Sequence, residues 1–409
     1  MLMMNDRMIP MGRWKQILIN VAPVIVFVSM LAGCKDKVAS PHKSDPPLPV
    51  IKSSLLVTLP EYATTPAGMA VDKDGNLIVA CPNFGSYSEK FPIPLKPACF
   101  LKITKDGKIS KWFDCPILNA THRACPMGID IGPDGELYVC DNQDWPTGNG
   151  KYGDVTQGRV LRFDFSDGKP EMTVVAKNIS HPHGIKYRNG MLYVTVSMLP
   201  QVNRKDKLLV SAVYRFPADG KDINVDNVES DKHILETFVT KNRFCQYGAS
   251  GMAFDSKGNL YVSDFGDGEI YKIGFDEDGK VVARDSYART DHDYNLDPGS
   301  IGFLDKAVKC SMRTARGLFF DGDDYLYVAD SANNAIAVIT PEVKVGVLLQ
   351  NGDTDGSDGK MDQPGYLINW NGKIVISCFD QLTGPGYVNT SHDSPYTIAC
   401  VELDENLAE

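Results

Sequence analysis

Six copies of one hairpin frame in the sequence predict an all-β fold, a six-bladed β-propeller with four antiparallel strands per blade. Each copy places a glycine before an apolar strand, then a tight turn and a second β-rich strand, as in PAGMAVDKDGNLIVA (66–80). The first four copies are followed by a second hairpin with an Asp-Gly turn, as in CFLKITKDGKISKWF (99–113). The copies lie 48 to 67 residues apart, with anchor glycines at Gly68, Gly128, Gly184, Gly251, Gly317 and Gly365. Four-stranded units at this period are typical of a propeller, whereas two packed β-sandwiches have no reason to repeat one hairpin six times.

Residues 1–33 have the pattern of a signal peptide. Arg13 and Lys15 precede an apolar run, 17–31, that is too short to span a bilayer comfortably. The run ends in LAGC (31–34), which resembles the bacterial lipobox, in which the cysteine thiol is acylated. A plain signal peptide with a chance cysteine is the alternative. We expect a lipoprotein of the bacterial cell envelope that is bound to the membrane through Cys34, and Lys35 after that cysteine favours the outer membrane, facing the periplasm.

The rest of the chain divides into a tether and the propeller. Residues 34–50 contain four prolines and are typical of an extended tether. The propeller follows over 51–409, and its sixth copy supplies only three strands before the chain ends. The segment IKSSLLVTLP (51–60) precedes the first anchor, so we predict that it completes blade six and closes the ring, which removes two exposed sheet edges.

The charge distribution argues against nucleic-acid binding. The net charge is −10, and Arg7, Arg13 and Lys15 against Asp6 give residues 1–34 a charge of +2. The remainder therefore carries about −12, and a basic face is not expected.

The cysteines fall into register with the blades. Export to an oxidising compartment makes disulfides the first interpretation. Eight cysteines are expected to form them: Cys81 and Cys99 in blade one, Cys378 and Cys400 at the same two places in blade six, Cys115 and Cys125 around the crossing to blade two, and Cys245 and Cys310 before the anchors of blades four and five. Cys140 is left over, and we expect it to be buried and inert.

The residue before each anchor glycine is expected to point toward the central axis. In chain order these residues are Ala67, Met127, His183, Ser250, Arg316 and Pro364. His183 is a candidate base, acid or ligand, and Arg316 is a candidate partner for a carboxylate or an oxyanion. Ser250 is a candidate nucleophile only if a base reaches it. The alternative is that these residues bind loop carbonyls or tunnel water. His181, before a proline, is expected at the surface.

Loop lengths indicate which face carries the site. The loops between second and third strands are long at 82–98, 141–158, 197–210 and 379–395, and short in blades four and five. They carry aromatic residues, among them Phe84, Trp145, Tyr152 and Tyr387. Aromatic walls around a few polar groups predict a small-ligand pocket at the tunnel mouth.

Acidic residues have more ordinary interpretations. Asp264 and Asp330 end second strands and are expected to cap the following turns. The segment NGDTDGSDGKMD (351–362) resembles a Ca²⁺ loop, but it lacks the bidentate glutamate of an EF-hand. We therefore favour a Gly/Asp-rich loop before blade six over an ion site.

The frame Pro-x-Gly, followed by Asp-Gly-x-Leu-Tyr-Val-x-Asp, resembles NHL-repeat and gluconolactonase/regucalcin-like six-bladed propellers, and the resemblance covers residues 51–409. It implies a fold that hosts lactonases, esterases, lyases and binding modules. Gluconolactonase-like members hold a divalent cation with a Glu, Asn and Asp set, partly in the axial positions. Here those positions hold Ala67, Met127, His183 and Ser250, so that metal site is expected to be absent. A divalent cation such as Ca²⁺ stays open as a cofactor without assigned residues.

Two further resemblances concern His183. Amidating lyases of the NHL type use the histidine of a PHG stretch as one of three zinc ligands, and paraoxonase-like esterases share that stretch. His183 matches this position, but the other blades offer no histidine in the same place and no accompanying calcium ligands are found.

Two function classes follow. One is a lipoprotein enzyme that hydrolyses a lactone, ester or sugar-acid ligand at the tunnel mouth. The other is a non-catalytic propeller that binds a small molecule or an envelope protein through the same face.

Overall fold

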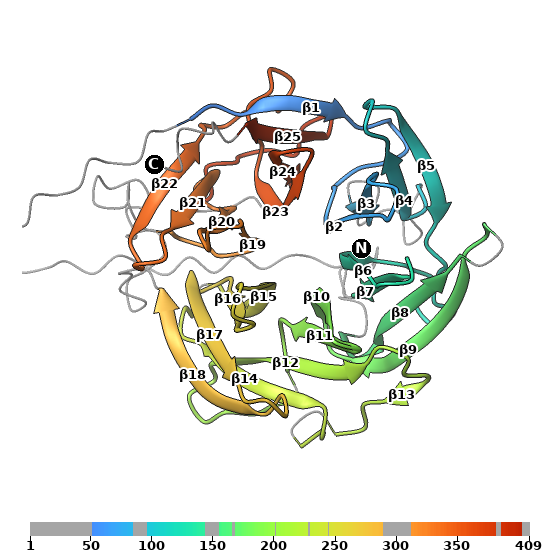
Figure 1. Ribbon diagram of the computed structural model, residues 1–409, viewed down its shortest axis with the longest axis vertical. Helices are drawn as coiled ribbons and strands as arrows, with labels where there is room; N and C mark the ends of the chain where they lie inside the picture. The colour runs from blue at the N-terminus through green and yellow to red at the C-terminus, as the bar shows by residue number, and fades with distance from the viewer. Residues whose placement is uncertain are drawn as a thin grey trace, which may run out of the picture. The chain divides into compact units, whose positions relative to one another are not determined.

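The computed structural model has six blades arranged around a central axis, as the six-copy frame predicts (Figure 1). It describes residues 51–84, 96–143, 155–165, 168–200, 202–227, 230–243, 245–288, 312–381 and 386–402. Apart from a 3₁₀ turn, η2 (Val155–Gln157), the regular elements in those ranges are strands. None of the elements described there is a helix that is long and apolar enough to cross a membrane.

Each blade is an antiparallel sheet whose strands follow one another from the axis outward (Figure 1). Blade one contains β2 (Met69–Val71), β3 (Leu77–Cys81), β4 (Cys99–Ile103) and β5 (Ile109–Asp114). Blade two contains β6 (Pro126–Ile131), β7 (Leu137–Asp141), β8 (Gly158–Asp164) and β9 (Glu171–Ile179), and blade three contains β10 (Pro182–Arg188), β11 (Met191–Val196), β12 (Leu209–Pro217) and β14 (Ile234–Thr240). Blade four contains β15 (Ala249–Phe254), β16 (Leu260–Asp264), β17 (Glu269–Phe275) and β18 (Val281–Ala288). Blade five contains β19 (Leu318–Phe320), β20 (Leu326–Asp330), β21 (Ala335–Ile339) and β22 (Val345–Gln350), and blade six contains β23 (Pro364–Trp370), β24 (Lys373–Cys378), β25 (Thr397–Glu402) and β1 (Ser54–Thr58).

The inner hairpins follow from local turn chemistry. In blade three, Asn189 and Gly190 have φ angles of 49° and 76° and join Arg188 to Met191 across a two-residue turn. Positive φ at both positions is what a tight hairpin turn requires, and Asn-Gly adopts it at low cost. Glycine or asparagine at these turns therefore indicates where one strand ends and its antiparallel partner begins.

The N-terminal strand closes the ring, as predicted. β1 is antiparallel to β25, with Ser54 opposite Cys400 and Thr58 opposite Thr397. The last blade thus combines the beginning and the end of the described chain, and the outer edge of β25 is covered.

The cores lie between the blades. Six clusters of buried side chains occupy the six junctions between neighbouring blades. The junction of blades six and one, for example, packs Val79 and Leu101 against Val375 and Ile398. Each blade is therefore stabilised by both neighbours, and the ring depends on every junction being filled.

One connection differs from the expected meander. Asp219-Gly220 was expected to turn directly into the fourth strand of blade three. The chain instead forms β13 (Ile223–Asn224), which pairs in parallel with β9 of blade two, with Ile223 opposite Ala176. Only then does it return as β14. β13 covers the outer edge of blade two.

Candidate functional site

The six residues before the anchor glycines are all buried, as their predicted axial position requires. Each blade is attached to the next at this level. A Cβ on Gly251 would lie 1.9 Å from the carbonyl oxygen of Arg316, and one on Gly184 would lie 2.4 Å from that of Ser250. Because a side chain cannot fit there, the anchor is glycine. The close approach places the axial residues of neighbouring blades side by side.

Buried hydroxyl groups complete these attachments in blades three and four. Thr195 Oγ1 accepts a hydrogen bond from Gly184 N at 2.7 Å and donates to Ser250 O at 2.5 Å. Ser263 Oγ accepts from Gly251 N at 2.8 Å and donates to Arg316 O at 2.7 Å. These bonds fix the backbone of two candidate residues, Ser250 and Arg316.

His183 lies fully buried within a polar cluster. Its Nδ1 is 3.2 Å from Ser250 Oγ and 3.1 Å from Tyr366 OH. The pKa of His183 is lowered well below its usual value, first by burial, then by the positive charge of Arg316 and then by His181. The imidazole is therefore neutral near pH 7 and can accept a proton.

His181 is part of the same cluster, so the prediction of a surface position is wrong. Its side chain is buried, and its ring lies parallel to that of His183 with centroids 6.4 Å apart. Asn142 Nδ2 lies 3.2 Å from the ring nitrogens, and Tyr247 OH lies 3.4 Å from Nδ1. A left-handed backbone, with φ of 44° at His181, accompanies this inward position.

Arg316 contributes a buried cation. Its side chain is 3% exposed, and its Cζ lies 3.7 Å from the centroid of the Phe379 ring and 5.8 Å from that of Tyr366. Within the described residues, no hydrogen-bond partner reaches Nη1. Burial lowers the pKa of Arg316, and only tyrosines, with no carboxylate among them, oppose that shift. The guanidinium is held by aromatic faces and lacks an acidic partner there.

The polar cluster borders an apolar one through Phe379, which contacts Arg316. Ala67, Met127, Cys125, Phe84 and Phe379 form one buried cluster. The axial positions thus divide into an apolar half from blades one, two and six and a polar half from blades three, four and five.

The predicted aromatic walls are placed in part. Phe84 lies in the apolar cluster, edge-on to Phe379 with centroids 6.1 Å apart. Tyr387 is half-buried. Burial raises its pKa, as do the charge of Cys245 and a hydrogen bond with it, while the charges of Arg313 and Arg316 act in the opposite direction. Trp145 and Tyr152 lie outside the described residues.

Two tyrosines that line the site were missed. The residue after the anchor glycine is aliphatic or methionine in five blades, at Met69, Ile129, Ile185, Met252 and Leu318, but it is Tyr366 in the sixth. That exception was a usable signal. Tyr247, in contrast, lies in an irregular loop outside the repeat frame, and only the tertiary structure places it edge-on to both His181 and His183.

The carboxylates at the ends of second strands hold loops, as predicted. Asp264 Oδ1 accepts from Asp267 N at 3.1 Å in the turn that follows. Asp330 Oδ1 accepts from Asn333 N at 3.4 Å in its own following turn. It also accepts from Arg313 N at 2.9 Å and Thr314 N at 3.0 Å, and so it holds the loop that carries Arg316.

The disulfide prediction is not confirmed. Cys81, Cys99, Cys115, Cys125, Cys245, Cys378 and Cys400 are free thiols, as is Cys140. Cys81 and Cys99 are directly opposite on β3 and β4, but Cys400 is opposite Val375, so the supposed match of Cys378 to Cys400 fails by three residues of register. Cys140 is buried, as expected. Cys34 and Cys310 lie outside the described residues.

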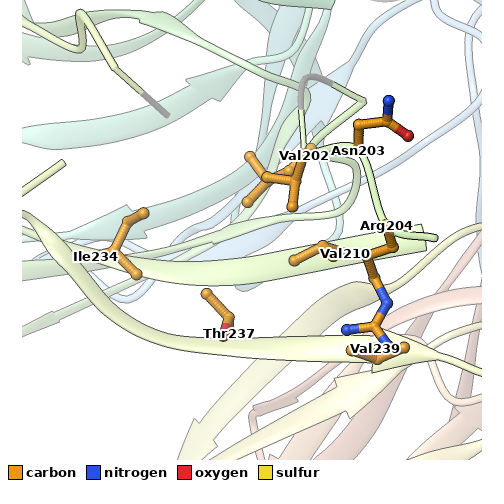
Figure 2. Close-up of a pocket in the computed structure, with 8 residues that line it drawn as sticks. Val202, Asn203, Arg204, Val210, Ile234, Thr237 and Val239 are labelled. Carbon is orange, nitrogen blue, oxygen red and sulfur yellow. The ribbon is translucent and has the colours of Figure 1, made fainter. Parts of the chain in front are cut away.

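A cavity of about 450 Å³ lies away from these groups, on the outer part of blade three (Figure 2). Its lining comprises Leu199, Val202, Asn203, Arg204, Val210, Ile234, Thr237 and Val239. The one arginine at this cavity pairs with Asp206 at 2.6 Å. It shares no residue with the axial cluster, and we assign no function to it.

No group of three or more histidine, cysteine, aspartate or glutamate side chains in the described ranges is arranged to hold a metal ion.

No protein-family model matches the chain, and no curated protein matches it. Solved six-bladed propellers do. A putative oxidoreductase, described as a glucose dehydrogenase, from Thermus thermophilus matches at a TM-score of 0.53 and 15% identity, over 85% of this chain and 98% of that chain. A luciferin-regenerating enzyme matches at 0.52 and 12% identity, over 86% and 95%. A gluconolactonase from Xanthomonas campestris matches at 0.48 and 14% identity, over 88% and 98%. At such identities the likeness is one of fold alone.

Proposed function

We propose that this propeller binds a small organic carboxylate at its axis, with Arg316 as the group that recognises the anion. The observation that supports it is the buried guanidinium of Arg316, which has an unpartnered Nη1 and no acidic neighbour among the described residues. Burying an uncompensated charge costs several kcal/mol, roughly, so a protein retains one where a ligand supplies the counter-charge. A carboxylate matches a guanidinium in charge and in planar geometry.

The neighbours of Arg316 restrict the rest of the ligand. Phe379 and Phe84 offer apolar ring faces on one side, while Ser250 and His183 offer hydrogen-bonding groups on the other. A ligand with a carboxylate, a polar substituent and an apolar or ring-shaped body fits both sides. Sugar acids, and the hydroxy acids that result when lactones open, belong to this class.

The test is a binding panel on the tether-free chain, residues 51–409. Carboxylates should raise the melting temperature of the wild type, and their uncharged amides should not. Arg316→Gln should abolish the response. Arg204→Gln, which removes the same charge from an exposed ion pair, should retain it. Equal responses in the two variants would show that Arg316 is not the recognition group.

Ester or lactone hydrolysis is a second candidate, favoured by the 3.2 Å separation of Ser250 Oγ and His183 Nδ1. A neutral His183 could take a proton from Ser250 or from water, and Arg316 could stabilise the developing oxyanion. Turnover of a lactone and ester panel, with Ser250→Ala and His183→Ala as comparisons, separates the two candidates. If the wild type shows no turnover and both variants change only binding, the protein is a binding module.

We also propose export and lipid anchoring at Cys34, on the basis of the N-terminal pattern. Metabolic labelling with palmitate should mark the full-length chain and fail with Cys34→Ser. A label retained in that variant would exclude Cys34 as the acylated residue. The alternative partner at the axial site is an envelope protein. If such a protein binds there, the carboxylate should compete with it for binding.

A further inference from the structure

Two buried oxygen atoms in blade six have no hydrogen-bond donor within the described chain. They are Oδ1 of Asp362, whose residue is 3% exposed, and Oδ1 of Asn389, whose residue is 1% exposed. Asp362 ends the loop before β23, and Asn389 lies in the connection between β24 and β25. An acceptor that is buried without a donor is costly, which makes two such atoms in one blade a feature that needs an explanation.

Both residues lie beside Asp380. Phe379 N donates to Gln363 O at 2.9 Å and Gln381 N donates to Gln363 Oε1 at 2.8 Å, which places Asp362 next to Asp380 at the neighbouring ends of β23 and β24. Asn389 Nδ2 donates to Asp380 Oδ1 at 2.6 Å and to Ser391 O at 3.1 Å. Asp380 is also the acid that affects Asp362 most strongly: after burial, its charge is the largest influence that raises the pKa of Asp362, to about 8. Asp353 and Asp393 add to the same effect.

The orientation of the Asn389 amide is determined by its bonds. Turning it over would place its oxygen against the Asp380 carboxylate, so the amide nitrogen must face Asp380 and the oxygen must face away. Oδ1 therefore has an acceptor role only, and no donor among the described residues fills it.

We propose that Asp362 and Asn389 bind a Ca²⁺ ion. One carboxylate and one amide oxygen in a field of further carboxylates are hard ligands, and Ca²⁺ commonly completes such a set with backbone carbonyls and water. This mixed set differs from a group of three acidic or histidine ligands, which the described residues lack. It also differs from the exposed aspartates that make segment 351–362 resemble a Ca²⁺ loop. Of these, Asp355 accepts a hydrogen bond from Ser357 and Asp358 accepts one from Lys360.

The ion would stabilise the closure of the ring. The loop that ends at Asp362 is bonded to the segment before β1, where Ser53 Oγ donates to Gly359 O at 2.9 Å and accepts from Met361 N at 3.1 Å. A cation shared with Asn389 would hold this loop against the β24–β25 connection. The site is independent of anion binding at Arg316.

Metal titration of the chelator-treated protein tests the site. Ca²⁺ should raise the melting temperature, and Tb³⁺ should luminesce on tyrosine excitation, because Tyr396 OH accepts a hydrogen bond from Gln381, the neighbour of Asp380, at 3.3 Å. Asp362→Asn, which keeps the side-chain shape, should weaken Ca²⁺ binding by about tenfold or more. Asp358→Asn is the control, since Asp358 is exposed in the same loop.

The alternative occupant is a proton on Asp362. Absence of Ca²⁺ and Tb³⁺ binding to the wild type would overturn the proposal, as would equal Ca²⁺ affinity in Asp362→Asn. If Asp362→Asn does not fold, metal analysis of the gel-filtered wild type decides, and a metal-free result after Ca²⁺ loading counts against the site. Carboxylate binding by the same preparations reports on Arg316 separately.

Discussion

At the scale of single residues, the axial site combines groups that are unfavourable to bury. Arg316 is a cation without an acid among the described residues, and His183 is kept neutral beside it. A core built for stability alone would hold apolar side chains in these positions, as blades one and two do with Ala67 and Met127. The difference between the two halves is what points to a ligand.

Removing the Arg316 charge should stabilise the empty protein. Arg316→Met keeps an unbranched side chain against Phe379 and removes the unpaired charge, so the free energy of unfolding should rise by about 1–3 kcal/mol while carboxylate binding is lost. Denaturant unfolding measures the first effect and the carboxylate panel the second. A clear loss of stability would mean that the guanidinium is structurally satisfied.

Anion binding should be coupled to protonation of His183. The groups that face His183 are Arg316, His181, Ser250, Tyr247 and Tyr366, and none is an acid. The folded-state pKa of His183 lies below its unfolded value of about 6.5. The free energy of unfolding therefore has its full value above about pH 6.5, and it falls as the pH drops from there toward the folded-state pKa. A carboxylate on Arg316 cancels part of the positive field and raises the pKa of His183.

Affinity for the carboxylate should therefore increase as the pH falls from about 7 to about 5, a range in which the ligand stays ionised. Calorimetric titrations at several pH values measure this slope. His183→Gln should flatten it, and an unchanged slope in that variant would assign the proton to another group.

At the scale of elements, buried hydroxyl groups on second strands connect blade three to blade four and blade four to blade five. Thr195 on β11 and Ser263 on β16 each bridge their own anchor glycine and the axial carbonyl of the following blade. In blades one and five, alanines occupy this place, and the anchor glycines bond directly to the next blade, as Gly68 N does to Met127 O at 3.0 Å. The hydroxyls of Thr195 and Ser263 thereby fix the backbone carbonyls of Ser250 and Arg316.

Thr195→Val should be strongly destabilising although valine has nearly the same shape. It leaves Gly184 N–H and Ser250 C=O without their partner, at about 1–3 kcal/mol for each buried group. Thr237→Val is the control, because Thr237 is exposed on β14. Equal stability of the two variants in urea unfolding would contradict the bridging role.

At the scale of the whole molecule, the ring is closed by pairing the two ends of the propeller. β1 covers β25, and the adjoining junction packs Leu59 and Leu56 with side chains of blades one and six. Since each core lies between two blades, loss of one junction weakens both neighbours. Closure is thus a property of the entire ring, because its stability depends on every junction between blades.

Deleting residues 51–60 should destabilise the whole domain, because it exposes the edge of β25 and opens the junction of blades six and one. Removal of residues 35–48 should leave the melting temperature unchanged. Circular dichroism of the two truncated proteins measures the difference. A native melting temperature in the first would show that three strands suffice for blade six.

The repeat predicted the blades and the residues before the anchor glycines because both depend on local rules, and it predicted the closure because the sixth copy is one strand short. Glycine is required where backbones approach, Asn-Gly where a hairpin turns, and alternating apolar residues where a strand packs. Those rules also located His183, Ser250 and Arg316. They missed β13 because its pairing is with a strand of another blade, and they misjudged Cys378 and Cys400 because strand register, which the repeat does not give, places Cys400 opposite Val375.

The sequence by itself determined the architecture and the list of axial side chains. Only the tertiary structure decided which of those side chains are unsatisfied: that Arg316 lies against Phe379 without an acid, that His181 turns inward, and that Asp362 and Asn389 each bury an oxygen without a donor. The physical reason is that hydrogen-bond satisfaction depends on residues from several blades at once, and a repeat describes one blade at a time.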